Sequence, residues 1–238
     1  GETASYPPEA LWPSDPAVLS ARIMSNVGQA AARGGAPDEQ TLASLEQLAA
    51  KEPLTAQPFL VHGAMSARTG DFVRAEQLLA IARQRAPRSA AARYLMGDIY
   101  LRTDRPVAAM AEMAVLNRLL AAGSLQLVPS LAAYARTPGS IPRIKTILEF
   151  FPALEEPLLA EMSTDATNTE AVLRLPSPRT GEGRAPVWQG MLLSTLVAQG
   201  QYQKAFATWR RLSAVSGRPG ELHNPQFDAS EASPPFNW

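Results

Sequence analysis

The chain has 238 residues, of which 46% are hydrophobic and 18% charged, and its 22 basic and 22 acidic residues cancel. This composition allows a sizeable apolar core and gives no overall field that would attract nucleic acid or an anionic membrane. The absence of cysteine excludes disulfides, thiol catalysis and cysteine-ligated metal sites. No stretch reaches the roughly 18 apolar residues of a membrane helix, so we expect no membrane span.

The N-terminal part of the chain predicts an extended segment followed by a weakly patterned helix pair. Residues 1–15 are polar and proline-rich and begin on Gly1, which allows for a targeting or anchoring segment removed upstream. Within residues 16–55, the leucines Leu42, Leu45 and Leu48 recur at helical spacing, and Asp38 is a candidate N-cap.

Matching residues recur at one spacing along the middle of the chain. Positions i and i+34 hold the pairs Gly63 and Gly97, Ala75 and Ala109, Leu79 and Met113, Pro53 and Pro87, and Tyr100 and Tyr134. Several matches in one register indicate an internal repeat. A single unit cannot bury its apolar face alone, so the repeat predicts stacked units.

Residues 58–87 show what one unit contains. Apolar residues recur at helical spacing over 58–68, where Gly63 leaves room for a second helix to approach closely. Residues 69–71 predict a turn, with Gly70 in the left-handed conformation. A second apolar stripe follows in Phe72, Ala75, Leu78, Leu79 and Ala82, and Pro87 ends that helix. The pattern predicts an antiparallel helix pair.

The unit resembles the tetratricopeptide repeat, which has a small residue at position 8, an aromatic at 11, glycine at 15, an aromatic at 17, alanine at 20 and proline at 32. In residues 56–89 these positions hold Gly63, Ser66, Gly70, Phe72, Ala75 and Pro87, so the aromatic at position 11 is missing. Residues 90–123 keep Gly97, Tyr100 and Ala109 but have Asp104 at the turn, and residues 186–216 keep Gly200, Tyr202 and Ala205. The resemblance implies an all-α fold, a right-handed superhelix of antiparallel helix pairs over residues 16–216. Its degenerate units are 16–55 and 124–185, the second broken into short helices by prolines.

Residues 217–238 predict a non-helical tail with three large aromatic residues. Asn224-x-x-Phe227 followed by Pro235-Phe236-Asn237-Trp238 resembles the entry strand of a β-sandwich. It is similar to the junction in bacterial helical-repeat proteins where a carbohydrate-binding-like domain follows the repeats, which implies a second domain beyond this chain. In the other interpretation, the aromatics fold back onto the last helix pair near Trp209.

No pattern in the sequence points to catalysis. The two histidines, His62 and His223, lie far apart, and His62 falls at a packing position of a repeat helix. The adjacent carboxylates of Glu155 and Glu156 would not face each other on a helix. The arginines of residues 83–105 lack the interleaved aromatics of nucleic-acid stacking platforms. We therefore expect no enzyme activity, no cofactor, no metal site and no nucleic-acid partner.

The resemblance implies that the first helix of each pair lines a concave groove that binds a protein or an extended peptide. The implied groove residues are Leu60, Ala64, Arg68, Tyr94, Asp98, Leu101, Arg102, Ser194 and Val197. Arg68 and Arg102 are separated by one repeat and would form a ladder of guanidinium groups for carboxylates or carbonyls. In the alternative interpretation, they pair with Asp98, Asp104 or solvent.

Three functional hypotheses follow. The first is implied by the resemblance to those bacterial repeat proteins, which are associated with exopolysaccharide and other envelope-polysaccharide systems. It is a non-enzymatic scaffold of the bacterial cell envelope, periplasmic or anchored through a removed segment, which would serve polysaccharide assembly or export and engage glycan through a missing domain. The second is a helical accessory domain of an enzyme whose catalytic domain lies outside this chain. The third is a generic cytoplasmic adaptor.

Overall fold

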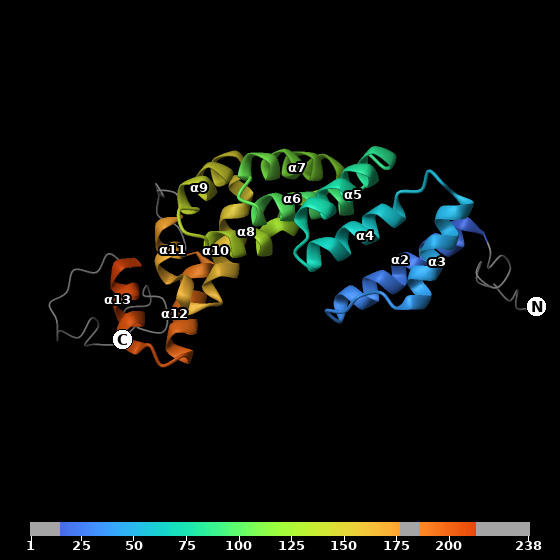
Figure 1. The fold of residues 1–238 in the computed structure, drawn as a ribbon. Helices are drawn as coiled ribbons and strands as arrows, with labels where there is room; N and C mark the ends of the chain where they lie inside the picture. The colour runs from blue at the N-terminus through green and yellow to red at the C-terminus, as the bar shows by residue number, and fades with distance from the viewer. Residues whose placement is uncertain (1–14, 177–185, 213–238) are drawn as a thin grey trace, which may run out of the picture. The chain divides into compact units, whose positions relative to one another are not determined.

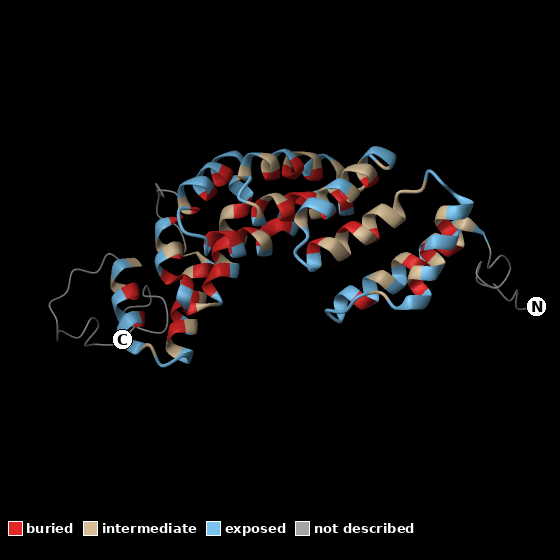
Figure 2. Ribbon diagram, in the orientation of Figure 1, coloured by how far each residue is buried: buried red, intermediate tan, exposed pale blue. Residues whose placement is uncertain are grey.

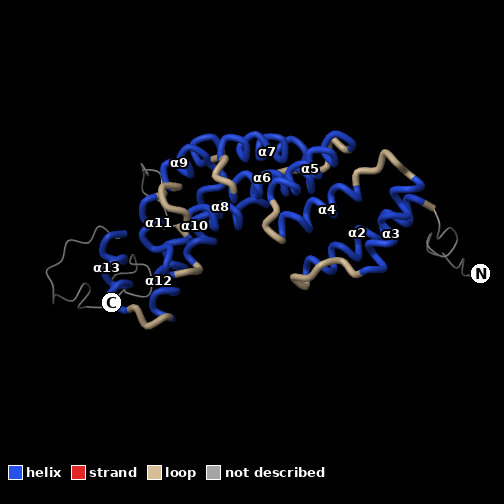
Figure 3. Tube along the Cα trace, viewed as in Figure 1, coloured by secondary structure: helices blue, strands red, loops and turns tan. Residues whose placement is uncertain are grey.

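The computed structural model describes residues 15–176 and 186–212, and this part of the chain contains helices and loops but no strand (Figure 3). The all-α prediction is confirmed for these residues. The expectations for the N-terminal segment up to residue 14, for residues 177–185 of the second degenerate unit and for the tail 217–238 lie outside the described residues. No helix within the described ranges combines the length and the apolar character that crossing a membrane requires.

The chain forms two compact units, Gly1–Gly123 and Ser124–Trp238. The helices of unit 1 are α2 (Pro16–Ala32), α3 (Glu39–Lys51), α4 (Gln57–Arg68), α5 (Phe72–Arg85), α6 (Ala90–Arg102) and α7 (Pro106–Leu119) (Figure 1). The 3-10 turn η1 (Gly123–Leu127) begins at the boundary. Unit 2 then contains α8 (Val128–Ala135), α9 (Ile141–Phe150), η2 (Pro152–Leu154), α10 (Glu155–Ser163), η3 (Ala166–Asn168), α11 (Thr169–Arg174), α12 (Val187–Ala198) and α13 (Tyr202–Leu212).

Unit 1 has a repeat-like architecture of three helix pairs. The helices α2 and α3, α4 and α5, and α6 and α7 pack against each other, and α5 also packs on α6. Short turns join the two helices of each pair, so the partners run antiparallel (Figure 1). The continuous superhelical array expected over residues 16–216 remains a prediction.

The turn inside each pair has the same backbone geometry. Positive φ angles of 68°, 85°, 57° and 71° occur at Gly34, Gly70, Asp104 and Gly200. At each, the amide of that residue donates to the carbonyl three positions earlier, and the next amide donates to the carbonyl five positions before it, with N···O distances between 2.7 and 3.3 Å. This is the Schellman ending of a helix, in which a left-handed residue directs two amides onto the last free carbonyls.

The close approach expected at Gly63 is confirmed. A Cβ atom at this position would lie 2.8 Å from Cγ of Leu79, a fully buried residue of α5. The absent side chain therefore lets α4 and α5 approach each other. Of the residues expected to form the apolar stripe of the second helix, Ala75, Leu79 and Ala82 are buried, whereas Phe72 and Leu78 are half-buried.

Two apolar clusters fill unit 1. The first combines α2, α3 and α4 through Leu19, Ile23, Leu45, Leu48 and Val61. The second combines α4, α5 and α6 through Ala67, Ala75, Leu79, Met96 and Ile99. Because α4 contributes to both clusters, it connects the first helix pair to the other two. Figure 2 shows buried residues along α6 in particular, in agreement with its six buried positions from Ala92 to Leu101.

A buried carboxylate joins the last three helices of unit 1. Glu112 of α7, with 5% of its side chain exposed, accepts hydrogen bonds from Arg83 of α5 at 2.7 Å and from Arg93 of α6 at 3.0 Å. Each carboxylate oxygen thus faces one guanidinium group, which satisfies the buried charge. The triad fixes α5, α6 and α7 relative to one another.

In unit 2, α10 packs against both α8 and α12, and α13 packs against α12. Its first four helices, α8 to α11, are shorter than those of unit 1, as expected from the prolines of residues 124–185. Trp188 of α12 and Trp209 of α13 are both buried.

Candidate functional site

A pocket of about 170 Å³ opens in unit 1 between the C-terminal half of α2, the turn before α3, and α4. Its walls are mostly apolar and built from small residues: Val27, Ala31, Gly34, Gly35, Ala36, Pro37, Val61, Ala64, Met65 and Arg68. Two of these, Ala64 and Arg68, belong to the predicted groove residues.

The local sequence explains why the pocket exists. Gly34 ends α2 in the left-handed conformation, where glycine carries no steric cost. The next residues, Gly35, Ala36 and Pro37, have no long side chains that could fill the space beside α4. Two other lining residues, Val61 and Met65, also contribute to the apolar cluster of α2, α3 and α4, which holds their side chains in place.

Arg68 is the single charged residue of the pocket wall. Its Nη1 donates a hydrogen bond of 3.1 Å to the carbonyl of Gly34, across the gap between α4 and the α2–α3 turn. This acceptor is neutral, and Arg68 faces no carboxylate in the part of the chain that the structure describes. Within the described residues, a solvent-exposed positive charge without an acidic partner therefore lies at the edge of an apolar pocket.

Arg102 has a different environment, although it occupies the position of Arg68 in the next repeat and is likewise the last residue of its helix. Its Nε lies 2.9 Å from Oδ2 of Asp98, one turn earlier on α6. For Arg102 the alternative interpretation, pairing with Asp98, is thus the observed arrangement. The two arginines are equivalent in the repeat, but only the charge of Arg68 lacks a described acidic partner.

The other predicted groove residues differ in accessibility. Leu60 is partly buried against the second apolar cluster. Tyr94 is half-buried, Leu101 is 2% exposed and Asp98 is 8% exposed, so the last two are largely closed to solvent. Ser194 is exposed and Val197 half-buried, and both belong to α12 of unit 2. The role of all these groove residues in binding remains a prediction.

The electrostatics beside the pocket involve the N-cap of α3. The pKa of Asp38 lies below its ordinary value of 3.8, chiefly because Thr41 donates hydrogen bonds to its carboxylate and in part because Arg33 is nearby. Arg33 directly precedes Gly34 in the chain, so its charge acts on Asp38 at the same turn.

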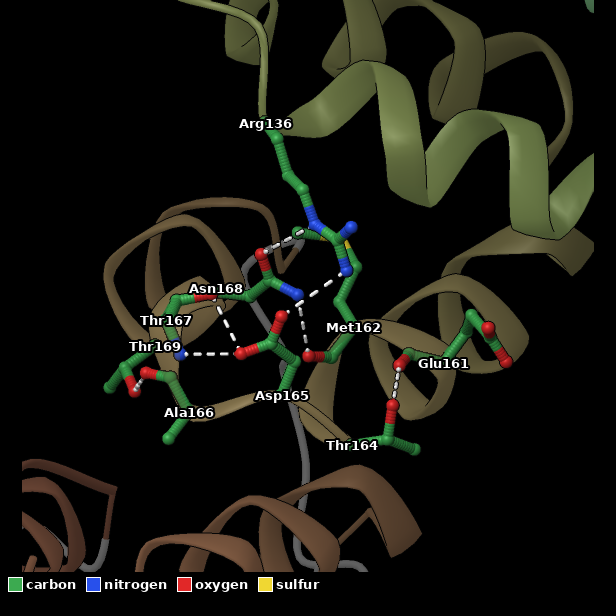
Figure 4. Close-up of polar contacts among 9 residues, drawn as sticks. All are labelled: Arg136, Glu161, Met162, Thr164, Asp165, Ala166, Thr167, Asn168 and Thr169. Atoms are coloured by element: carbon green, nitrogen blue, oxygen red, sulfur yellow. Dashed lines mark hydrogen bonds and ion pairs between the residues drawn. The ribbon is translucent and has the colours of Figure 1, made fainter.

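Unit 2 contains a polar cluster that the sequence patterns did not predict (Figure 4). Arg136, which caps the C-terminal end of α8, points toward the turn between α10 and η3 and contacts Asp165 at 3.3 Å and Asn168 at 3.4 Å. Asp165 also accepts from the amide and hydroxyl of Thr167, and the buried Asn168 donates to the carbonyl of Met162 at 3.0 Å.

These groups bond to one another, so the cluster serves to hold the turn in place. The hydrogen bonds from Thr167, and to a lesser degree Arg136, keep the pKa of Asp165 below its ordinary value. The spacing of Asp165 and Thr167, an acidic residue two positions before a hydroxyl residue, is the signal in the sequence from which this turn could have been expected.

Histidine and carboxylate groups do not form a metal site within the described residues. His62 lies half-buried on α4. No group of three or more histidine, aspartate or glutamate residues in residues 15–176 and 186–212 has the arrangement to hold a metal ion.

Comparisons of the chain with protein-family models, with curated proteins and with solved structures found no match.

Proposed function

We propose that the chain is a non-enzymatic interaction module of the tetratricopeptide-like kind, and that unit 1 binds a segment of a partner protein at the pocket between α2 and α4. The observation that carries this proposal is the pocket itself, an apolar cavity with Arg68 at its edge on a predicted groove face. The helix pairs supply a rigid frame for it, since α4 is packed into the apolar clusters on both sides.

The size of the pocket favours one side chain over a larger ligand. Sites for drug-sized molecules measure roughly 300–1,000 Å³, whereas a cavity of about 150 Å³ accepts a benzene ring. At about 170 Å³, the pocket matches a single branched or aromatic side chain. Interfaces concentrate their binding energy in such anchors, which fill a pocket and exclude water.

Selection from a display library of random peptides tests the proposal on the full chain. We expect enrichment of peptides with a common apolar residue. Ala64→Phe and Ala31→Phe, which fill the pocket from its two walls, should weaken binding of the selected peptides roughly ten- to hundred-fold, as expected from the loss of about 1.5–3 kcal/mol for one buried apolar side chain.

Ala111→Phe, on an exposed position of α7, is the matched control and should bind as the parent chain does. Circular dichroism of all three variants verifies that they fold. The proposal fails if the library yields no enriched peptide, or if both filled variants bind as tightly as the control.

The cellular setting rests on resemblance alone. We propose that the module acts in the bacterial envelope, in polysaccharide assembly or export, with the partner protein docked on unit 1. Fractionation of cells that produce the full-length protein should recover it with the periplasm or membranes. Recovery in the cytosol alone would favour the adaptor hypothesis instead.

A further inference from the structure

We propose that the segment bound in the pocket carries an aspartate or glutamate two residues away from its anchoring apolar side chain, and that Arg68 binds this carboxylate. The inference rests on the proposed function, because it specifies the chemistry of the partner at the same pocket.

The first argument is charge. Six arginines of the described chain face a carboxylate of their own unit, namely Arg83, Arg93, Arg102, Arg105, Arg136 and Arg211. The exposed Arg68 instead donates to a neutral carbonyl, as Arg85 does elsewhere in unit 1. Arg33, on the same turn, acts on the carboxyl group of Asp38. Because Arg68 is the one charged residue among those that line this pocket, the positive charge available to a ligand there is that of Arg68.

The second argument is position. The hydrogen bond to Gly34 holds the guanidinium group between α4 and the turn, and the left-handed φ of 68° at Gly34 fixes the direction of that turn. One of the five donors of the group is used, which leaves others for a carboxylate. A guanidinium group that is already held in place can form charge-assisted, bidentate hydrogen bonds with little further loss of side-chain entropy.

The third argument is spacing. Gly34, Gly35 and Ala36 line the pocket and carry at most a methyl group, so a peptide backbone can approach closely at this edge. Along an extended peptide, neighbouring side chains point to opposite faces, and residues two apart share a face at a separation of about 6.6 Å. With one apolar side chain in the pocket, a side chain two positions away reaches the edge where Arg68 lies. The adjacent residue points away.

A free carboxyl terminus on the anchoring residue itself is the other source of a carboxylate at Arg68. It would place the charge deeper, next to the apolar side chain. The small residues at this edge of the pocket leave room for the peptide to continue beyond the anchoring residue, so we assign the carboxylate to a side chain.

Peptides taken from the selection and fluorescently labelled test this inference by anisotropy with the full chain. The selected peptides should carry an acidic residue two positions from the apolar one. Replacing it with the amide should weaken binding about ten-fold, the effect of one charge-assisted hydrogen bond. In Arg68→Gln this difference should vanish, and Arg68→Lys should retain part of it. Arg102→Gln, at the equivalent position of α6 but paired with Asp98 in the parent chain, is the control and should leave the difference intact.

The outcomes separate the two proposals. If removal of the apolar side chain abolishes binding but the acid-to-amide change has no effect, the role of Arg68 is wrong and the pocket stands. That role is also wrong if Arg68→Gln retains the ten-fold difference, or if only peptides that end in a free carboxylate at the apolar residue bind. If neither change matters, the pocket is not the binding site and both proposals fall.

Discussion

Glu112 can be tested against a more accessible carboxylate of the same unit, that of Glu76, by making the same substitution at both. Glu112→Gln keeps the size of the side chain but removes its charge. The amide oxygen still accepts from one guanidinium, while the amide nitrogen, a donor, now faces the other. Because Glu112 is 5% exposed and Arg93 18% exposed, water replaces the lost bond poorly. Arg83, 33% exposed, can turn toward solvent.

These exposures set the expected magnitude. Breaking a fully buried pair costs about 3–5 kcal/mol, and losing one hydrogen bond to a charged group costs about 1.5–3 kcal/mol. Since one arginine can be rehydrated, we expect a loss of about 2–3 kcal/mol. Glu76→Gln removes an equally short pair with Arg105, at 2.7 Å, but its side chains are 33% and 42% exposed. For this control we expect about 0.2–1 kcal/mol.

Urea unfolding followed by far-UV circular dichroism measures both losses. The chain has two compact units and need not unfold in one step, so the two variants are compared at the transition that they shift. Added salt should reduce the loss in Glu76→Gln, because exposed charges are screened, and leave most of the loss in Glu112→Gln. If Glu112→Gln costs no more than Glu76→Gln, or if salt removes both losses equally, the triad does not act as a buried ion pair.

Three further predictions concern the turns and contacts of the fold. In the same urea experiment, Gly70→Ala should lower the free energy of unfolding by about 1 kcal/mol, because φ is 85° there while nothing crowds an added Cβ. Gly28→Ala, on the open surface of α2, should instead raise it by about 0.5–1 kcal/mol. Gly63→Ala should cost about 1–3 kcal/mol through its clash with Leu79, and measurably less in a Leu79→Ala background, which a double-mutant cycle would show. Asp165→Asn should lower the stability of the fold near neutral pH. A carboxyl group whose pKa is lowered in the folded state stabilises the fold at a pH above its ordinary pKa of 3.8, and it loses this effect as the pH falls through its folded-state pKa. A pH series should therefore show the parent and variant converging in acid, and a constant difference would contradict the argument.

The helix pairs of unit 1 could be predicted because their signals are local. Gly63 and Gly70 show this well. An apolar stripe broken by a glycine turn specifies two helices and their close contact without reference to any distant residue. The short helices of unit 2 were expected from prolines for the same reason.

The pocket could not be predicted, because it depends on packing between distant segments. Ala64 and Arg68 were expected on a groove face, but their partners Gly34 and Gly35 lie about one repeat earlier, in a unit with little sequence pattern. The different environments of Arg68 and Arg102 have the same origin. Residues at equivalent repeat positions have different neighbours, since Asp98 precedes Arg102 by one turn while Ala64 occupies that place before Arg68.

Asp104 explains how a degenerate repeat can keep its geometry. At this turn the sequence lacks the glycine found at Gly34, Gly70 and Gly200, yet its backbone adopts the same left-handed conformation, with φ of 57°. Aspartate tolerates that region better than most residues, and the two Schellman hydrogen bonds at 3.2 and 2.7 Å satisfy the end of α6. What the units share is therefore a set of backbone hydrogen bonds rather than a residue. A search by residue identity therefore finds fewer helix pairs than the fold contains. The pair α2–α3, which forms one wall of the pocket, matches the repeat pattern poorly in such a search.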